Sequence, residues 1–122
     1  MAGKEEQALK WGLKAAEHGH IGAQADLATH YFNNRNYVKA FDWCKNAASL
    51  GEAQAQYLLG CIYFSGLGGV DVDYKMAIKY FEHAANQNHR KALLELANCY
   101  MYGLGVENDV NKAIALMLKA RL

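Results

Sequence analysis

Residues 55–63 read Ala-Gln-Tyr-Leu-Leu-Gly-Cys-Ile-Tyr, and variants of this stretch occur at 23–31 and at 92–100. Each copy begins with Ala, has Leu four residues later, then a small residue, and ends with Tyr. Steps of four residues place the Ala, Leu and Tyr side chains on one face of a helix. The chain is therefore predicted to form the same amphipathic helix three times.

A second pattern follows each copy and also occurs alone near the start of the chain. It begins with an alanine, has a large aromatic or aliphatic residue three positions later, and has another alanine seven positions after the first. These steps again define one helix face. The anchor alanines are 32, 37 and 36 residues apart: Ala8, Ala40, Ala77 and Ala113. Such a period indicates an array of paired helices.

The segments between these helices contain residues typical of helix ends. Residues 66–69 and 103–105 carry glycines, which accept the positive φ angle found where a helix stops. Good N-cap residues lie four positions before three of the anchors: Asn36, Asp73 and Asp109. Three further residues are expected to end the second helices: Gly19, Gly51 and Asn88.

These signals predict an all-α fold, a solenoid of helix-turn-helix repeats in which each unit contacts only its neighbours. We expect one domain, because 122 residues fit a single domain. It would consist of a half repeat at 5–20 and three repeats, at 21–52, 53–89 and 90–122. The predicted helices cover about residues 5–18, 22–33, 37–50, 53–65, 74–87, 90–102 and 110–121.

The composition suits a helical chain and argues against several functions. Proline is absent, and hydrophobic residues make up 52% of the sequence. The 13 basic and 12 acidic side chains form no block of one sign, which argues against nucleic-acid binding. No apolar run approaches the roughly 20 residues that span a bilayer. Because residues 1–6 do not read as a secretory leader, we expect a cytoplasmic protein unless a leader has been removed.

The cysteines and histidines form no persuasive catalytic pattern. Cys44, Cys61 and Cys99 are odd in number and widely spaced, which suits small apolar side chains better than disulfides. His18 and His20 could bind a metal, but a structural or solvated role is favoured. A cysteine–histidine nucleophile has no support beyond composition. The sequence thus predicts no catalytic residue, no metal and no cofactor.

Residues 55–85 resemble the Sel-one-like repeat, a relative of the tetratricopeptide repeat with a longer, glycine-containing turn. They read Ala-Gln-Tyr-x-Leu-Gly-x-x-Tyr-x-x-Gly-x-Gly, then Asp, Lys-x-Ala and Tyr-Phe-x-x-Ala-Ala. Residues 92–120 carry most of this pattern, whereas the first repeat lacks the Gly-x-Gly turn and is similar to a plain tetratricopeptide repeat. The resemblance implies a right-handed α-α superhelix whose first helices line a concave groove.

In such a groove, partner-binding residues would lie between the packing positions of the first helices. The packing positions, expected to be buried, are Leu27, Tyr31, Trp43, Leu59, Tyr63, Tyr80, Leu96 and Tyr100. The predicted partner-binding residues are Phe32, Asn33, Tyr57, Phe64, Asn98, Met101 and Tyr102. We expect alanine at Tyr57 or Tyr102 to weaken binding without unfolding the protein. The alternative is that the aromatic residues pack against the next helix.

The last predicted helix is apolar on a side that no later helix would cover. Its apolar residues are Ile114, Leu116, Met117, Leu118 and Leu122. A solenoid normally needs a polar capping helix. Three explanations stay open: a longer array, pairing of this face with another copy or a partner, and a tolerated exposed edge.

Together these features favour a non-catalytic protein–protein interaction module, a scaffold or adaptor that binds a protein or peptide in the groove. One alternative is a small stand-alone inhibitor or immunity-type protein that neutralises one specific protein. Another is a spacer within a large repeat protein. A metal-binding or hydrolytic enzyme is the alternative from a different class, and the fold alone does not name a partner.

Overall fold

The computed structural model describes residues 2–122, except for the side chains of Ala2 and Glu5. Its helices are α1 (Ala2–Glu17), α2 (Ile21–Asn33), α3 (Tyr37–Ser49), α4 (Ala53–Ser65), α5 (Tyr74–Ala85), α6 (Arg90–Tyr102) and α7 (Val110–Ala120), with a 3-10 turn, η1 (Leu67–Gly69), after α4. Every predicted helix is present, and each end lies within three residues of the prediction. The described residues contain no strand, and no helix among them is long and apolar enough to cross a membrane.

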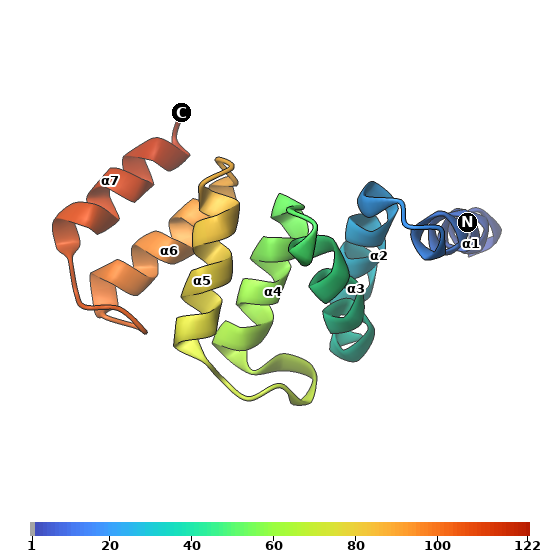
Figure 1. The fold of residues 1–122 in the computed structure, drawn as a ribbon, viewed down its shortest axis with the longest axis horizontal. Coiled ribbons are helices and arrows are strands. Elements are labelled where there is room, and N and C mark those ends of the chain that lie inside the picture. Colours follow the sequence, from blue (N-terminus) through green and yellow to red (C-terminus); the bar gives the residue numbers. More distant parts are fainter. Residues whose placement is uncertain (1) are drawn as a thin grey trace.

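The helices follow one another in a row, with the two ends of the chain at opposite ends of that row (Figure 1). Each helix packs against the next, and α2 also lies against α4. The pairs α2–α3, α4–α5 and α6–α7 are the three repeats, and α1 stands before them as a lone second helix. This confirms the predicted all-α solenoid, whose stability comes from contacts between neighbours.

The predicted N-cap residues do begin the second helices. The side chains of Asn36, Asp73 and Asp109 accept hydrogen bonds from the amides three residues later, at 3.4, 3.1 and 3.0 Å. These amides have no partner within the helix, so each cap is worth about 1 kcal/mol. At the other end, Gly66 and Gly103 terminate α4 and α6 in the left-handed conformation.

The glycine-rich turns also join one repeat to the one before it. A Cβ atom on Gly68 would lie 3.0 Å from the backbone of Tyr37, and one on Gly105 would lie 2.9 Å from that of Tyr74. Tyr37 and Tyr74 are the first residues of α3 and α5, the second helices of the preceding repeats. Only a residue without a Cβ atom allows this approach, so the turns contribute to stacking as well as to chain reversal.

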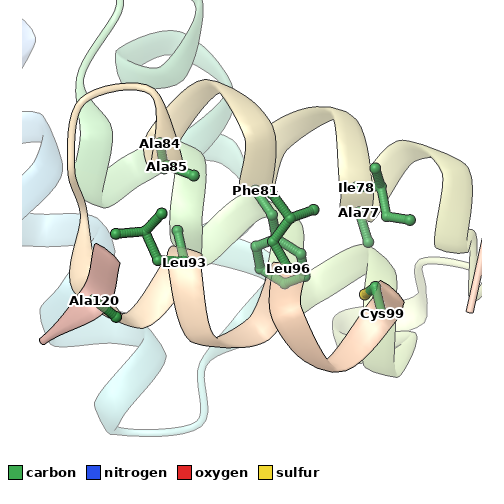
Figure 2. Close-up of a cluster of buried hydrophobic side chains, with 10 residues drawn as sticks. Ala77, Ile78, Phe81, Ala84, Ala85, Leu93, Leu96, Cys99 and Ala120 are labelled. Carbon is green, nitrogen blue, oxygen red and sulfur yellow. The ribbon is translucent and has the colours of Figure 1, made fainter. Parts of the chain in front are cut away.

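The core is a series of small clusters between neighbouring helices. The largest surrounds Phe81, a fully buried residue of α5 that packs with Leu93 and Leu96 of α6 (Figure 2). Burying one such side chain stabilises the fold by roughly 1.5–3 kcal/mol. The leucines of the expected core are buried. Full burial was a wrong expectation for its aromatic residues, which are half-buried because their rings pack at the edges of the clusters: Tyr31, Trp43, Tyr63, Tyr80 and Tyr100.

Two buried glutamines link the first helix of a repeat to the preceding second helix. Gln24 Nε2 donates to the carbonyl oxygen of Ala16 at 3.1 Å, and Gln56 Nε2 donates to that of Ala48 at 3.4 Å. A buried amide without partners would cost about 1–3 kcal/mol, so these bonds are necessary at this depth. The third repeat has Leu93 at the same position, where an apolar side chain needs no partner.

Candidate functional site

The first helices of the repeats lie on the inner side of the solenoid. Helix α2 lies against α4, whereas no two second helices pack comparably in the described part of the chain. The first helices of the first two repeats are therefore closer together than any two second helices of the described residues, as the inner side of a curve requires. We define the inner stripe as the side chains that recur along this side: Thr29 and Asn33 of α2, Gln54, Tyr57, Cys61 and Ser65 of α4, and Lys91, Leu94, Asn98 and Tyr102 of α6.

A polar and aromatic contact between the stripe and His89 joins α4 to the start of α6. The rings of Tyr57 and His89 stack with their centroids 4.8 Å apart, and Nε2 of His89 lies 2.7 Å from Oε1 of Gln54. The Nε2 atom of Gln54 donates in turn to Oγ1 of Thr29 in α2, at 3.4 Å. This chain of contacts fixes the three inner helices relative to one another.

His89 takes part as a neutral imidazole. Its Nδ1 accepts a hydrogen bond from the amide of Ala92 at 3.2 Å, which makes it the N-cap of α6. Because Nδ1 accepts and Nε2 faces the carbonyl oxygen of Gln54, the proton lies on Nε2. Burial lowers the pKa of His89, in agreement with this neutral form. His20 caps α2 in the same way, so the favoured structural role of these histidines is an N-cap.

The middle of the stripe is close to electrically neutral. Burial raises the pKa of Cys61 to about 11, an effect opposed by its hydrogen bond with Tyr57. Glu95 raises this pKa further and Lys91 lowers it, so one carboxylate and one ammonium group flank the thiol. A thiol with so high a pKa is a poor nucleophile at neutral pH. Among the described residues, no three His, Cys, Asp or Glu side chains are grouped to hold a metal.

Three of the seven predicted partner-binding residues are exposed: Asn33, Asn98 and Tyr102. The Tyr102 side chain is 71% exposed, an unusual environment for a large aromatic ring. Leu94, 39% exposed, was not among the predicted binding residues, although its four-residue spacing from Asn98 was a usable signal. Leu94, Asn98 and Tyr102 therefore form one exposed line along α6.

The other four predicted residues are half-buried. The ring of Phe32 lies 5.3 Å from that of Tyr37, and the ring of Phe64 lies 5.1 Å from that of Tyr74. Both phenylalanines thus pack on the first residue of the following helix, which was the alternative interpretation. Met101 holds the corresponding position in α6 and is likewise half-buried.

Tyr57 is half-buried as well and belongs to the packing between repeats. Besides stacking on His89, its ring lies 6.1 Å from that of Phe81 and contacts two core clusters. Tyr57→Ala is therefore expected to change the packing between repeats as well as any binding, so it is not a clean test of the groove. Removal of this ring is expected to destabilise the protein by on the order of 2 kcal/mol. Tyr102, which makes no comparable packing, remains a suitable position for testing a binding role.

Comparison with known proteins places these features in a family. The Sel1 repeat profile matches residues 4–20, 21–52, 53–89 and 90–121. The chain is 34% identical over 108 residues to the Sel1-repeat-containing protein YjcO of Escherichia coli K12. The aligned residues make up 88% of this chain and 46% of YjcO. It is 31% identical to chitin synthase regulatory factor 2 of Schizosaccharomyces pombe, over 71% of this chain and 19% of that protein. The chain therefore spans less than half the length of each of these two relatives.

A solved structure shares the architecture. The fold matches the crystal structure of c5321, described as a protective antigen present in uropathogenic Escherichia coli strains displaying an SLR fold. The TM-score is 0.88 at 39% sequence identity, over 94% of this chain and 25% of that chain. The repeat architecture of residues 2–122 is therefore also found as part of a larger solenoid.

Proposed function

The chain belongs to the Sel1 repeat family, and on this premise we propose that it is a non-catalytic adaptor that holds a segment of a partner protein along the inner stripe. Proteins built from Sel1 repeats generally bind other proteins. The relative named as a regulatory factor supports a role exercised on another protein, not on a small substrate. The high pKa values of the cysteines and the capping roles of His20 and His89 also favour a binding protein over an enzyme.

The observation that carries the proposal is the exposed line on α6. Leu94 and Tyr102 provide apolar area that is already accessible, and Asn98 stands between them with an amide able to donate and accept. An extended peptide presents backbone N–H and C=O groups in alternation with side chains, so an amide flanked by apolar residues suits it. Aromatic side chains of this kind commonly anchor protein interfaces.

The charges of the stripe indicate the kind of segment that would bind. Lys91 is the one charged residue of the inner stripe. Glu95, four residues later in α6, has the opposite charge and shifts the pKa of Cys61 in the opposite direction. A strongly charged ligand would find little compensation here, whereas an uncharged segment with one or two large apolar side chains would. Recognition of a free C-terminal carboxylate is disfavoured, because it requires a cluster of cations.

The test begins with affinity capture, using the whole chain as bait in a lysate of the cells that encode it. The protein retained is then titrated by calorimetry against the wild type and the double variant Asn98→Ala/Tyr102→Ala. Both positions are exposed, so the variant should keep the wild-type unfolding midpoint. Val38→Ala is the control, since Val38 is 60% exposed but lies on the second helix α3.

We expect the double variant to lose about tenfold or more in affinity, which corresponds to roughly 1.4 kcal/mol. The control should bind as the wild type does. A partner held equally by the wild type and the double variant would remove the inner stripe from the proposal. A stoichiometric partner lost only in the Val38→Ala variant would move the binding site to the outer side.

A further inference from the structure

The outer side of α7 carries an apolar face that packs against nothing in the described residues. We define the end face as Val110, Ile114 and Leu118, which are 46%, 45% and 56% exposed, together with the half-buried Met117. These residues follow one another at steps of three and four, so they share one side of the helix. Contacts of α7 are made chiefly with α6, on its other side.

The preceding repeat shows what covers such a face. Ile78 of α5 is the counterpart of Ile114, and it is only 5% exposed because α6 packs over it. Tyr74, the counterpart of Val110, is covered in part by the turn at Gly105. The interface between α5 and α6 would thus continue onto α7 if another amphipathic helix lay there. The geometry of the array therefore defines both the place and the direction of a docked helix.

The end face is wider than stacking of a further repeat requires. At the position of Leu118, α3 has Lys45 and α5 has Glu82, both exposed charged residues. A leucine there adds apolar area outside the strip that a following helix covers in the first two repeats. An exposed apolar group at a site that is charged in both sister repeats indicates contact with a larger surface.

The rim of the end face is basic. Arg90 and Lys91 at the start of α6 and Lys119 and Arg121 at the end of α7 are all exposed. Helix α7 itself, from Val110 to Ala120, has no acidic residue. Arg90, Lys119 and Arg121 also border a hollow of about 550 Å³, with the buried Leu93 in its wall. The surface therefore combines an apolar strip with a positive edge.

The position of these charges specifies one end of the incoming helix. Where α4 meets α6, the side chain of Gln54 is hydrogen-bonded to His89, the N-cap residue of α6. Lys91 occupies the position of Gln54 in the third repeat. An incoming N-cap residue would therefore meet an ammonium group, which favours Asp or Glu. Acidic residues are also favoured in the first turn by the helix dipole, and Glu52 already caps α4 in this way.

We propose that the end face binds an amphipathic helix of a partner protein, one with an acidic first turn, laid against α7 as α6 lies against α5. A second copy of the chain fits less well. At the other end of the array, α1 shows the exposed Trp11 beside Lys10 and Lys14, so pairing the two ends would bring like charges together. Pairing of α7 with α7 would do the same with Lys119.

A peptide from the chain itself supplies a suitable probe. Residues 51–66 contain α4, whose N-cap is the acidic Glu52 and whose packing against α3 is the model for docking. The peptide carries Tyr57→Lys and Cys61→Glu joined by a side-chain lactam. This bridge holds the helix, which would be marginal at this length, and it joins two positions of the inner stripe. Binding of the fluorescently labelled peptide to the whole chain is followed by anisotropy.

Saturable binding is expected to weaken about tenfold or more with Ile114→Glu in the chain, and also with Glu52→Lys in the peptide. Salt should weaken binding of the unchanged peptide, because the cations are exposed. Trp11→Ala, at the opposite end, is the control and should bind normally. Ile114 is exposed, so circular dichroism of Ile114→Glu should match the wild type.

Two results would overturn the proposal. One is the absence of saturable binding, or equal binding by the wild type and Ile114→Glu. The other is a dimer in light scattering that Leu118→Glu converts to a monomer, which would assign the end face to a second copy. Neither result bears on the inner stripe, so this inference and the proposed function fail independently.

Discussion

Replacement of Gly60 by alanine separates packing from helix propensity. Gly60 lies inside α4, where propensity alone predicts that alanine stabilises the helix by about 1 kcal/mol. In the structure, an added Cβ atom would lie 2.6 Å from two ring carbons of Phe81 and 3.2 Å from the carbonyl oxygen of Ala77. Helix propensity and core packing therefore predict changes in stability of opposite sign for this substitution.

The magnitude follows from the surroundings of the ring. Phe81 has no exposed surface and is held by Leu93 and Leu96, so it cannot turn away without moving α6. Overpacking of this kind costs about 1–3 kcal/mol. Gly12 provides the reference, because a Cβ atom there would meet only Leu27, at 4.0 Å. Gly12→Ala should raise the free energy of unfolding by about 1 kcal/mol. The Gly60→Ala variant should be less stable than the Gly12→Ala variant by about 1–3 kcal/mol.

Urea unfolding followed by circular dichroism measures both variants, and thermal midpoints should shift by roughly 4 °C per kcal/mol. Phe81→Leu completes a double-mutant cycle, since a smaller side chain makes room for the new methyl group. Gly60→Ala should then cost less in the Phe81→Leu background than in the wild type. The reasoning is refuted if Gly60→Ala stabilises as much as Gly12→Ala does, or if the two substitutions add without coupling.

Two further predictions concern titratable groups. Because burial lowers the folded-state pKa of His89, the stability it contributes is present above the unfolded-state pKa of about 6.5 and falls as pH drops below it. The urea midpoint of the wild type should therefore be lower below pH 6.5 than above it, and this difference should be smaller for His89→Asn, which keeps an N-cap. An equal difference in the two proteins would contradict this role of His89. Burial raises the pKa values of Cys44 and Cys99 to about 12 and about 11, so a thiol reagent at neutral pH should label them only after denaturation. Mass spectrometry should find Cys61 labelled first, and rapid labelling of Cys44 in the native protein would contradict the burial.

The fold was predictable because its signals are local. An N-cap such as Asp73 and a C-terminal glycine such as Gly66 act within one turn of the helix they bound. The alternation of Ala, Leu and Tyr fixes which face is buried without reference to distant residues. The length of the turn in each repeat also follows from the sequence, because it is the spacing between the two helix patterns. These signals set the order and the bounds of the helices, and stacking of neighbours does the rest.

The candidate site was predictable only in part, because its residues depend on contacts between repeats. Asn98 and Tyr102 are exposed as expected, since their helix positions point away from both neighbours. Phe64 occupies a position that seemed equally open, but the first residue of α5 lies against it. The stack of Tyr57 on His89 joins residues 32 positions apart across a repeat junction. Helical spacing contains no information about that distance or about the superhelical rotation that closes it.

Differences between the repeats distinguish packing from recognition. Gly60 faces the large Phe81, whereas its counterpart Ala28 packs in a cluster with Cys44, so a change at one packing position is matched by a change at its neighbour. Such compensation is what close packing demands. Tyr102 and Leu118 also differ from their counterparts, yet both are exposed and no neighbour changes to accommodate them. An uncompensated apolar substitution on the surface adds little to the packed core, so Tyr102 and Leu118 are the positions at which the proposed contacts with other molecules are to be tested. The same comparison within one chain assigns Gly60 to the core, Tyr102 to the inner stripe and Leu118 to the end face.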